Sequence, residues 1–361
     1  MAKRKLNPIW MAAAFAVVAA SLWITFSTSF MAKHERYDDM LAAARKMAEA
    51  TAEIKRMRAE LGVPISPADD PNGTGLIGQE LTDITTTVGN LQSKRTSTNP
   101  DFAALTVSYF DKLGLKDKDL VAVGASGSFP GIMISVLSAC YVTGVEPVII
   151  PSIGASEYGA NIPGLTSVEM LDRLNKAGIF DYVPAAISLG GAGDIGEGGI
   201  IADSKPILQR IADESGHRVI VPADTPDSIR QRMAAFEAAG EIKAFINIGG
   251  AEPNFGSTSA SLEVSNGIVT KPPRKVDSPD MGLIFEYLNK GVPVIHFLDI
   301  KGLAMKSGIP VDPVPLPAFG TSMVYFQKKY EKAYAAAGLV AAVLLVTVPV
   351  ALGKGKGLGK R

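Results

Sequence analysis

The chain has 361 residues, of which 47% are hydrophobic and 20% are charged, and its 36 basic side chains balance 36 acidic ones. Seven of the basic residues and none of the acidic ones lie in 1–32 and 333–361, so residues 33–332 carry a net charge of −7. An acidic body of this kind is a poor general nucleic-acid binder, because that affinity comes mainly from neutralising phosphates. The single cysteine, Cys140, excludes an internal disulfide, and we expect it to be a buried core residue.

Two long uncharged segments lie near the ends of the chain, at residues 6–32 and 333–353. Each exceeds the roughly 20 apolar residues that a helix needs to cross a bilayer, so we predict transmembrane helices at 9–30 and 333–353. A cleavable signal peptide competes with the first helix, but its apolar core would span only about 7–15 residues. A buried core helix competes with the second, whose richness in Ala, Val and Leu favours a membrane span.

Basic residues indicate the orientation of these helices in the cell (inner) membrane. The tails at 1–8 and 354–361 are basic and contain no acid, which favours the cytoplasmic side for both termini. Basic residues also follow the first helix and precede the second, so the local counts are nearly even. Large domains translocate largely regardless of charge, so the charge of the short tails determines the predicted orientation. We expect residues 66–330 to form an extracytoplasmic domain.

Residues 31–65 contain a predicted membrane-proximal helix. Apolar residues recur at helical spacing from Met40 to Ile54, with charged residues between them. Gly62 and Pro64 end the pattern. The apolar stripe either packs against the core, which is the default, or contacts a partner helix.

From about residue 100, short apolar runs alternate with helical segments. The predicted strands are 119–124, 147–150, 186–189, 219–221, 244–248 and 292–297, and the predicted helices are 130–143, 167–177, 203–215, 226–239 and 281–290. Strands that alternate with helices of this length are typical of a parallel sheet with helices on both faces. We therefore predict an α/β fold with a mostly parallel, Rossmann-like sheet and one transmembrane helix at each end.

Three glycine-rich segments directly follow predicted strands. They are Gly124–Gly131 (GASGSFPG), Gly190–Gly199 (GGAGDIGEGG) and Gly249–Gly256 (GGAEPNFG). Loops at the carboxyl ends of parallel strands line the crevice where ligands bind, and glycine lets backbone N–H groups approach an anion closely. Any one loop could serve only as a tight turn, but the three together predict a ligand site.

The first loop supports two chemical interpretations. It partly matches the G-x-S-x-G nucleophile elbow, with Ser126 as nucleophile, although Ser128 stands where the last glycine belongs. The base would be His296, at a strand end with Asp299 nearby, or His217. A hydrogen-bonded structural histidine is the opposing interpretation of His296.

The second interpretation is an anion cradle, in which Ser126, Gly127 and Ser128 offer donors at a helix N-terminus. No Walker A or G-x-G-x-x-G motif occurs, so a carboxylate or phosphate ligand is favoured over a nucleotide, and we expect no cofactor. Asp194 and Glu197 could act as acid, base or hard-cation ligands, but a solvated loop is the default for both. With three histidines in the chain and none near these two residues, we expect no metal site.

Residues 82–100 are dense in hydroxyl side chains and contain Lys94 and Arg95. Basic side chains among hydroxyls suit carboxylate recognition, and the same segment could instead cap the following helix through Ser97, Thr98 or Asn99. Ten residues form the predicted ligand site: Lys94, Arg95, Gly124, Ser126, Gly127, Ser128, Gly191, Asp194, Glu197 and Gly250.

Several long strings make the chain resemble the bacterial poly-γ-glutamate system protein family. They are IGQELTDITTTVGNLQSKRTSTNPDFAAL (77–105), VAVGASGSFPGI (121–132), IGASEYGANIPG (153–164) and SLGGAGDIGEGG (188–199). The resemblance covers nearly the whole chain. It implies a membrane component that acts with an ATP-dependent ligase and a multi-span export partner to make a capsule-like anionic polymer. It transfers no catalytic residue.

Two hypotheses for the function follow. The first is a membrane-anchored accessory component of poly-γ-glutamate biosynthesis and export, which binds the anionic polymer at the glycine-rich loops. The second is a serine-type hydrolase or transpeptidase that acts on the polymer through Ser126 and His296. A small-molecule sensor that uses the same crevice is a third hypothesis.

Overall fold

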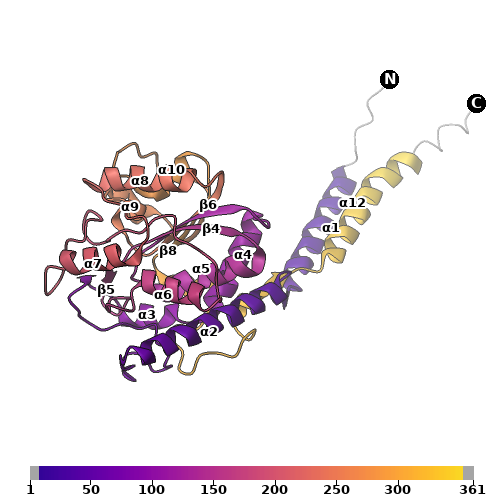
Figure 1. Ribbon diagram of the computed structural model, residues 1–361. Coiled ribbons are helices and arrows are strands. Elements are labelled where there is room, and N and C mark those ends of the chain that lie inside the picture. Colours follow the sequence, from indigo (N-terminus) through magenta and orange to yellow (C-terminus); the bar gives the residue numbers. More distant parts are fainter. Residues whose placement is uncertain (1–7, 353–361) are drawn as a thin grey trace, which may run out of the picture. The chain divides into compact units, whose positions relative to one another are not determined.

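A computed structural model of the chain describes residues 8–352 and divides them into two compact units. Unit 1 contains residues up to His34 and from Phe326 onward, and unit 2 contains Glu35–Tyr325. The predicted tails at 1–8 and 354–361 lie almost entirely outside the described residues. Each unit is described by itself below (Figure 1).

Unit 1 is built from two long helices and a short sheet. The helices are α1 (Pro8–Ser27) and α12 (Lys332–Leu352), and the antiparallel strands are β1 (Phe30–Lys33) and β9 (Phe326–Lys329). By length and composition both helices could cross a membrane, and most of their side chains are exposed. A buried core helix is therefore the wrong interpretation of the second apolar segment.

The two helices of unit 1 lie side by side and approach closely at one glycine. A Cβ added at Gly338 of α12 would fall 2.0 Å from Oγ of Ser21 in α1. Small residues at such a point let two helix backbones come together, as is usual for helices packed in a membrane. Ser21 Oγ itself donates to the carbonyl oxygen of Val18, so its hydroxyl is satisfied within α1.

In unit 2 the central sheet has five strands in the order β4-β3-β6-β8-β7. The strands are β4 (Glu146–Pro151), β3 (Leu120–Ala125), β6 (Ile242–Ile248), β8 (Val294–Phe297) and β7 (Gly267–Val269). All neighbouring pairs are parallel except β7 with β8. The prediction of an α/β fold with a mostly parallel sheet is therefore confirmed, and the antiparallel edge strand β7 was not predicted.

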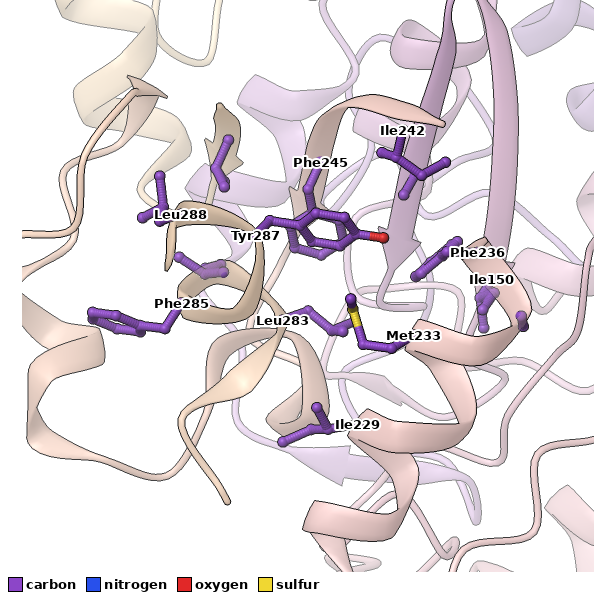
Figure 2. Close-up of a cluster of buried hydrophobic side chains, with 14 of the residues drawn as sticks. Ile150, Ile229, Met233, Phe236, Ile242, Phe245, Leu283, Phe285, Tyr287 and Leu288 are labelled. Carbon is purple, nitrogen blue, oxygen red and sulfur yellow. The ribbon is translucent and has the colours of Figure 1, made fainter. Parts of the chain in front are cut away.

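The first face of the sheet packs against α8 (Thr225–Glu237) and α10 (Gly282–Asn289). Figure 2 shows this cluster, in which side chains of both helices meet those of the sheet. Phe245 of β6 stacks on Tyr287 at 5.0 Å between ring centroids and meets the edge of Phe236 at 6.3 Å. Removing a fully buried ring of this kind typically costs about 3–5 kcal/mol.

The opposite face is covered by α4 (Asp101–Leu113) and α5 (Pro130–Thr143), which pack against each other. Tyr109 of α4 lies 6.0 Å from the ring of Phe297 in β8, which places α4 on that face. Cys140 of α5 is fully buried and free, as the sequence predicted.

The predicted membrane-proximal helix is α2 (Tyr37–Glu60), and it belongs to unit 2. Its apolar stripe packs on α4 and α5 and is completely buried at Met40, Met47 and Ile54. Core packing is therefore the correct interpretation of this stripe. At its far end, Glu53 pairs with Arg173 of α6 (Ser167–Lys176), which anchors α2 to a second helix.

The remaining elements of unit 2 are short. They are β2 (Thr85–Thr87), α3 (Leu91–Ser97), β5 (Ala155–Ser156), α7 (Lys205–Ser215), α9 (Glu252–Phe255), α11 (Ile300–Ser307) and 3-10 turns at Ser259–Glu263 and Met323–Tyr325. β2 and β5 pair in parallel as a separate two-stranded sheet. This pairing ties the hydroxyl-rich segment before α3 to the chain that follows β4.

Two predicted strands are absent as regular strands. Residues 186–189 and 219–221 form only isolated parallel bridges, Ile187 with Val219 and Ser188 with Ser152. Proline bounds both segments, at Pro184 and Pro222, and a residue without an N–H cannot extend a ladder. Both segments still make backbone hydrogen bonds, from the Ser188 N–H to Pro151 and from the Ile220 N–H to Ile187, and Ile187 packs in a buried cluster with Leu208 of α7.

Candidate functional site

The order of the strands creates a crevice at the carboxyl ends of β3 and β6. The chain runs from β3 outward to β4 on one side and later returns to add β6 on the other side of β3. Loops that leave the sheet at such a reversal diverge and leave room for a ligand. At this point the backbone N–H of Ser126 donates to the carbonyl oxygen of Ile248 at 2.9 Å, which joins the two loops at their bases.

A cavity of about 570 Å³ opens at this crevice, within the size range of small-molecule sites. Its lining contains residues that follow β3, β4, β6 and β8, together with β2 and α3. All three predicted glycine-rich loops contribute to it. Seven hydroxyl side chains line it: Thr86, Thr87, Ser93, Ser126, Ser128, Ser152 and Ser156.

Lys94 is the one basic side chain in the described lining of this cavity, and it is 2% exposed. Asn90 caps α3 by accepting the N–H of Ser93, which starts the helix that carries Lys94. The Lys94 ammonium nitrogen contacts the carbonyl oxygen of Ser128 and lies 2.6 Å from Oγ of Ser156. Burial lowers the pKa of Lys94 to about 7, and the nearby Glu157 carboxylate offsets only part of that effect.

Three serines form a hydrogen-bonded ladder beside Lys94. Ser126 Oγ donates to Ser128 Oγ at 3.0 Å and accepts the backbone N–H of Ser128 at 3.2 Å. Ser128 Oγ also accepts the backbone N–H of Ser156 at 3.0 Å. With both lone pairs of Ser128 Oγ engaged, its hydroxyl hydrogen has no acceptor among residues 8–352 and is available to a ligand.

Asp194 and Arg232 form a fully buried ion pair at one side of the cavity. Arg232 donates from Nη2 to Asp194 Oδ2 at 2.8 Å, and the hydroxyls of Ser188 and Ser228 donate to the same carboxylate. A buried charge must be paired and hydrogen-bonded in this way. The solvated-loop interpretation of Asp194 is therefore wrong, because the residue is a buried support of the loop.

Gly191 shows why the second loop needs glycine. Its φ of 72° lies in the left-handed region, and a Cβ there would fall 2.2 Å from the carbonyl oxygen of Glu197. The backbone N–H of Gly193 donates to the Glu252 carboxylate at 2.8 Å, and Glu252 also accepts the hydroxyl of Thr225. The second and third loops are thus joined by a hydrogen bond.

Six of the ten predicted ligand residues line this cavity: Lys94, Ser126, Ser128, Gly191, Asp194 and Gly250. The charged residues Arg95 and Glu197 are outside the lining. Arg95 makes a two-bond pair with Asp312, at 2.8 Å from Nε and 2.5 Å from Nη2. Glu197 is exposed and lies 3.7 Å from Lys205. Both side chains already have partners of opposite charge.

Gly124 and Gly127 also lie outside the lining and have packing roles. A Cβ at Gly124 would fall 2.5 Å from Nδ2 of Asn254, and one at Gly127 would fall 2.8 Å from the carbonyl oxygen of Gly154. Both positions therefore require close backbone approach. Their role in this structure is packing.

The proposed Ser126–His296 pair is not formed in this structure. His296 is 1% exposed, meets Asn247 through Nδ1 at 2.9 Å and stacks on Phe255. Burial lowers its pKa to about 4, so the ring is neutral at pH 7. The Asp299 carboxylate caps α11 by accepting the N–H of Gly302, and His217 bonds to Asp172. The Nε2 of His296 is buried and has no hydrogen-bond partner among the described residues, so the ring is held by Asn247 and by packing on Phe255 and forms no catalytic pair here.

Sequence reasoning missed Ser156, Glu252 and Arg232. Ser156 follows β4 at the same edge of the sheet, so the rule that selected the other loops would have found it. Glu252 lies within the third glycine-rich loop, where only glycine was considered. Arg232 lies inside α8, and nothing in the sequence near it signals a buried charge. No group of three or more His, Cys, Asp or Glu residues within the described chain is arranged to hold a metal ion.

Comparison with protein-family models, with curated proteins and with solved structures found no match to this chain.

Proposed function

We propose that this chain is a membrane-anchored accessory component of poly-γ-glutamate biosynthesis and export. Unit 2 would be a Rossmann-like extracytoplasmic domain that binds the polymer at the crevice cavity, and α1 and α12 would anchor it with both termini in the cytoplasm. The likeness of four long strings to the family supports this proposal, and so does the presence of two helices apolar enough to cross a membrane. Its partners would be a poly-γ-glutamate ligase and a multi-span exporter.

The observation that carries the proposal is the composition of the cavity lining. A γ-glutamyl chain presents one carboxylate and one amide N–H at every residue. The Ser128 hydroxyl and the glycine loops offer donors to a carboxylate, and Glu252 offers an acceptor to the amide. A lining of hydroxyls with one buried cation binds such a chain weakly enough for it to move.

Lys94 supplies the only positive charge of the described lining, so its protonation should control the affinity for an anion. The protonated form dominates below its pKa of about 7 and is lost above it. Attraction to a carboxylate is therefore present in full below pH 6 and declines as the pH rises through 7. We expect roughly a tenfold loss of affinity between pH 6 and pH 8.5, equivalent to ~1.4 kcal/mol.

The test is binding of a fluorescent γ-linked glutamate oligomer to the full chain in detergent, measured by anisotropy across this pH range. Lys94→Met should bind weakly at pH 6 and show no pH dependence. Lys116→Met, which removes an exposed lysine, is the matched control and should behave as the wild type. A wild-type affinity that does not change with pH, or a Lys94→Met variant with wild-type affinity, would contradict the proposal.

A further inference from the structure

Lys94 and Ser156 are placed as a base and a nucleophile would be. They come from different elements, α3 and β5, and both line the crevice cavity. The lysine nitrogen lies 2.6 Å from the serine oxygen, and the two residues are 2% and 4% exposed. The Ser128 carbonyl oxygen holds the same nitrogen from a second direction. The lysine is thereby fixed next to one hydroxyl.

The protonation state of Lys94 fits that role. A buried lysine with a pKa of about 7 has a large neutral fraction near pH 7, and only the neutral amine can accept a proton. Glu157 is the carboxylate that favours its charged form. The acids of the described cavity lining are Asp194, paired with Arg232, and Glu252, which accepts from Gly193 and Thr225.

Ser128 supplies the third part of an acyl-transfer site. Its Oγ lies 3.0 Å from the backbone nitrogen of Ser156, and its hydroxyl hydrogen is free for a ligand within the described chain. A donor next to the nucleophile can stabilise the negative charge that develops on a carbonyl oxygen under attack. The buried Ser126 hydroxyl, which donates to Ser128, orients that donor.

We propose that Ser156 is an acyl-accepting nucleophile activated by Lys94, and that the cavity cleaves or transfers amide bonds of carboxylate-bearing chains. The choice of a γ-glutamyl amide as the substrate rests on the proposed function. Serine–lysine pairs are a known variant of the serine–histidine arrangement. The nucleophile is therefore Ser156, and Ser126 is a positioning residue.

The reaction proceeds in two balanced steps. In the first, Ser156 Oγ bonds to the amide carbon while its proton passes to Lys94 Nζ. The C–N bond then breaks, and the Lys94 ammonium gives that proton to the departing amine. In the second, water or another amine attacks the ester and gives a proton to Lys94. Lys94 returns the proton to Ser156 Oγ as the acyl group leaves.

A fluorophosphonate probe on the full chain in detergent tests this assignment, with the modified residue located by peptide mass analysis. We expect one adduct, on Ser156, forming at a rate that rises as the pH passes through about 7. Ser257→Ala, which removes an exposed serine, should label at the wild-type rate. Ser156→Ala should lose the adduct, and Lys94→Arg should lower the rate at least 100-fold, because arginine stays protonated.

If a variant fails to fold, the labelling of the wild-type chain still tests the proposal. An adduct on Ser126, an adduct on no serine, or a rate that does not change with pH would overturn the proposal. The result is separable from that of the binding test, because labelling must increase with pH whereas oligomer affinity must decrease. If the chain binds the oligomer but the probe does not label Ser156, only the catalytic proposal is overturned. If the probe labels Ser156 but the chain does not bind the oligomer, the polymer is not the substrate.

Discussion

Asp194 and Lys94 line the same cavity, but only the charge of Asp194 is compensated by a partner of opposite charge. Asp194 faces Arg232 and two hydroxyls, so its charge is compensated inside the protein. Lys94 contacts oxygen dipoles and the Phe129 ring, 4.0 Å from its nitrogen, and makes no salt bridge among the described residues, so the Glu157 carboxylate offsets only part of the effect of burial. Desolvation therefore dominates at Lys94 and favours its neutral form. One charge supports the structure, and the other is available for chemistry.

The buried pair makes a prediction about stability. Asp194→Asn leaves Arg232 charged and without its partner, which should lower the free energy of unfolding by about 3–5 kcal/mol. Denaturant unfolding of the full chain in detergent measures this change. Glu214→Gln breaks an exposed pair with Arg210 and should cost at most ~1 kcal/mol. A loss below 1 kcal/mol for Asp194→Asn would show that the pair does not support the loop.

At the scale of elements, the helices were predicted most accurately. The helix at 130–143 has the predicted bounds, because Pro130 begins it and Gly144 ends it in the left-handed conformation. The hydroxyl-rich segment proved to contain α3, a helix of only seven residues, whose hydrophobic pattern is too short to detect. Asn99 accepts the N–H of Asp101 just before α4, although the N-cap position itself is Pro100, which has no side-chain cap.

The close approach of α1 and α12 makes a prediction at this scale. Gly338→Leu places a side chain where Ser21 already lies, so the two helices must separate. We expect the melting temperature of unit 1 in detergent to fall by several degrees. The fluorescence of Trp10 and Trp23 in α1, followed during heating, measures this change. Ala337→Leu, on the exposed side of the same turn, should have little effect. Equal effects of the two changes would argue against close packing of the helices.

At the scale of the whole molecule, the sequence predicted the sheet edge that holds the site but not the contacts within it. Three glycine loops after strands were enough to locate the crevice, since parallel strands share a carboxyl edge. The pairing of Lys94 with Ser156 joins residues 62 positions apart through the small β2–β5 sheet. Arg95, its neighbour in the chain, turns to Asp312 instead. Only the three-dimensional fold distinguishes these adjacent basic residues.

The proposed orientation in the membrane also makes a prediction. Residues 271–275 are mostly exposed and contain Arg274 and Lys275, which are cleavage sites for trypsin. If unit 2 is extracytoplasmic, trypsin added to spheroplasts should cut there without permeabilisation. Replacing Arg274 and Lys275 by Gln should remove that cut and leave the protein otherwise intact. Cleavage only after permeabilisation would place unit 2 in the cytoplasm and contradict the proposal.

The β1–β9 pairing has a consequence for how such a chain could arise. Lys33 and Phe326 are direct partners in that two-stranded sheet, so unit 2 leaves and re-enters it at neighbouring points. Domains whose ends meet in this way can be inserted into another protein without disturbing it. A short turn from residue 33 to 326 would close a two-helix hairpin complete in itself. The chain therefore has the layout of a domain inserted into a two-helix hairpin.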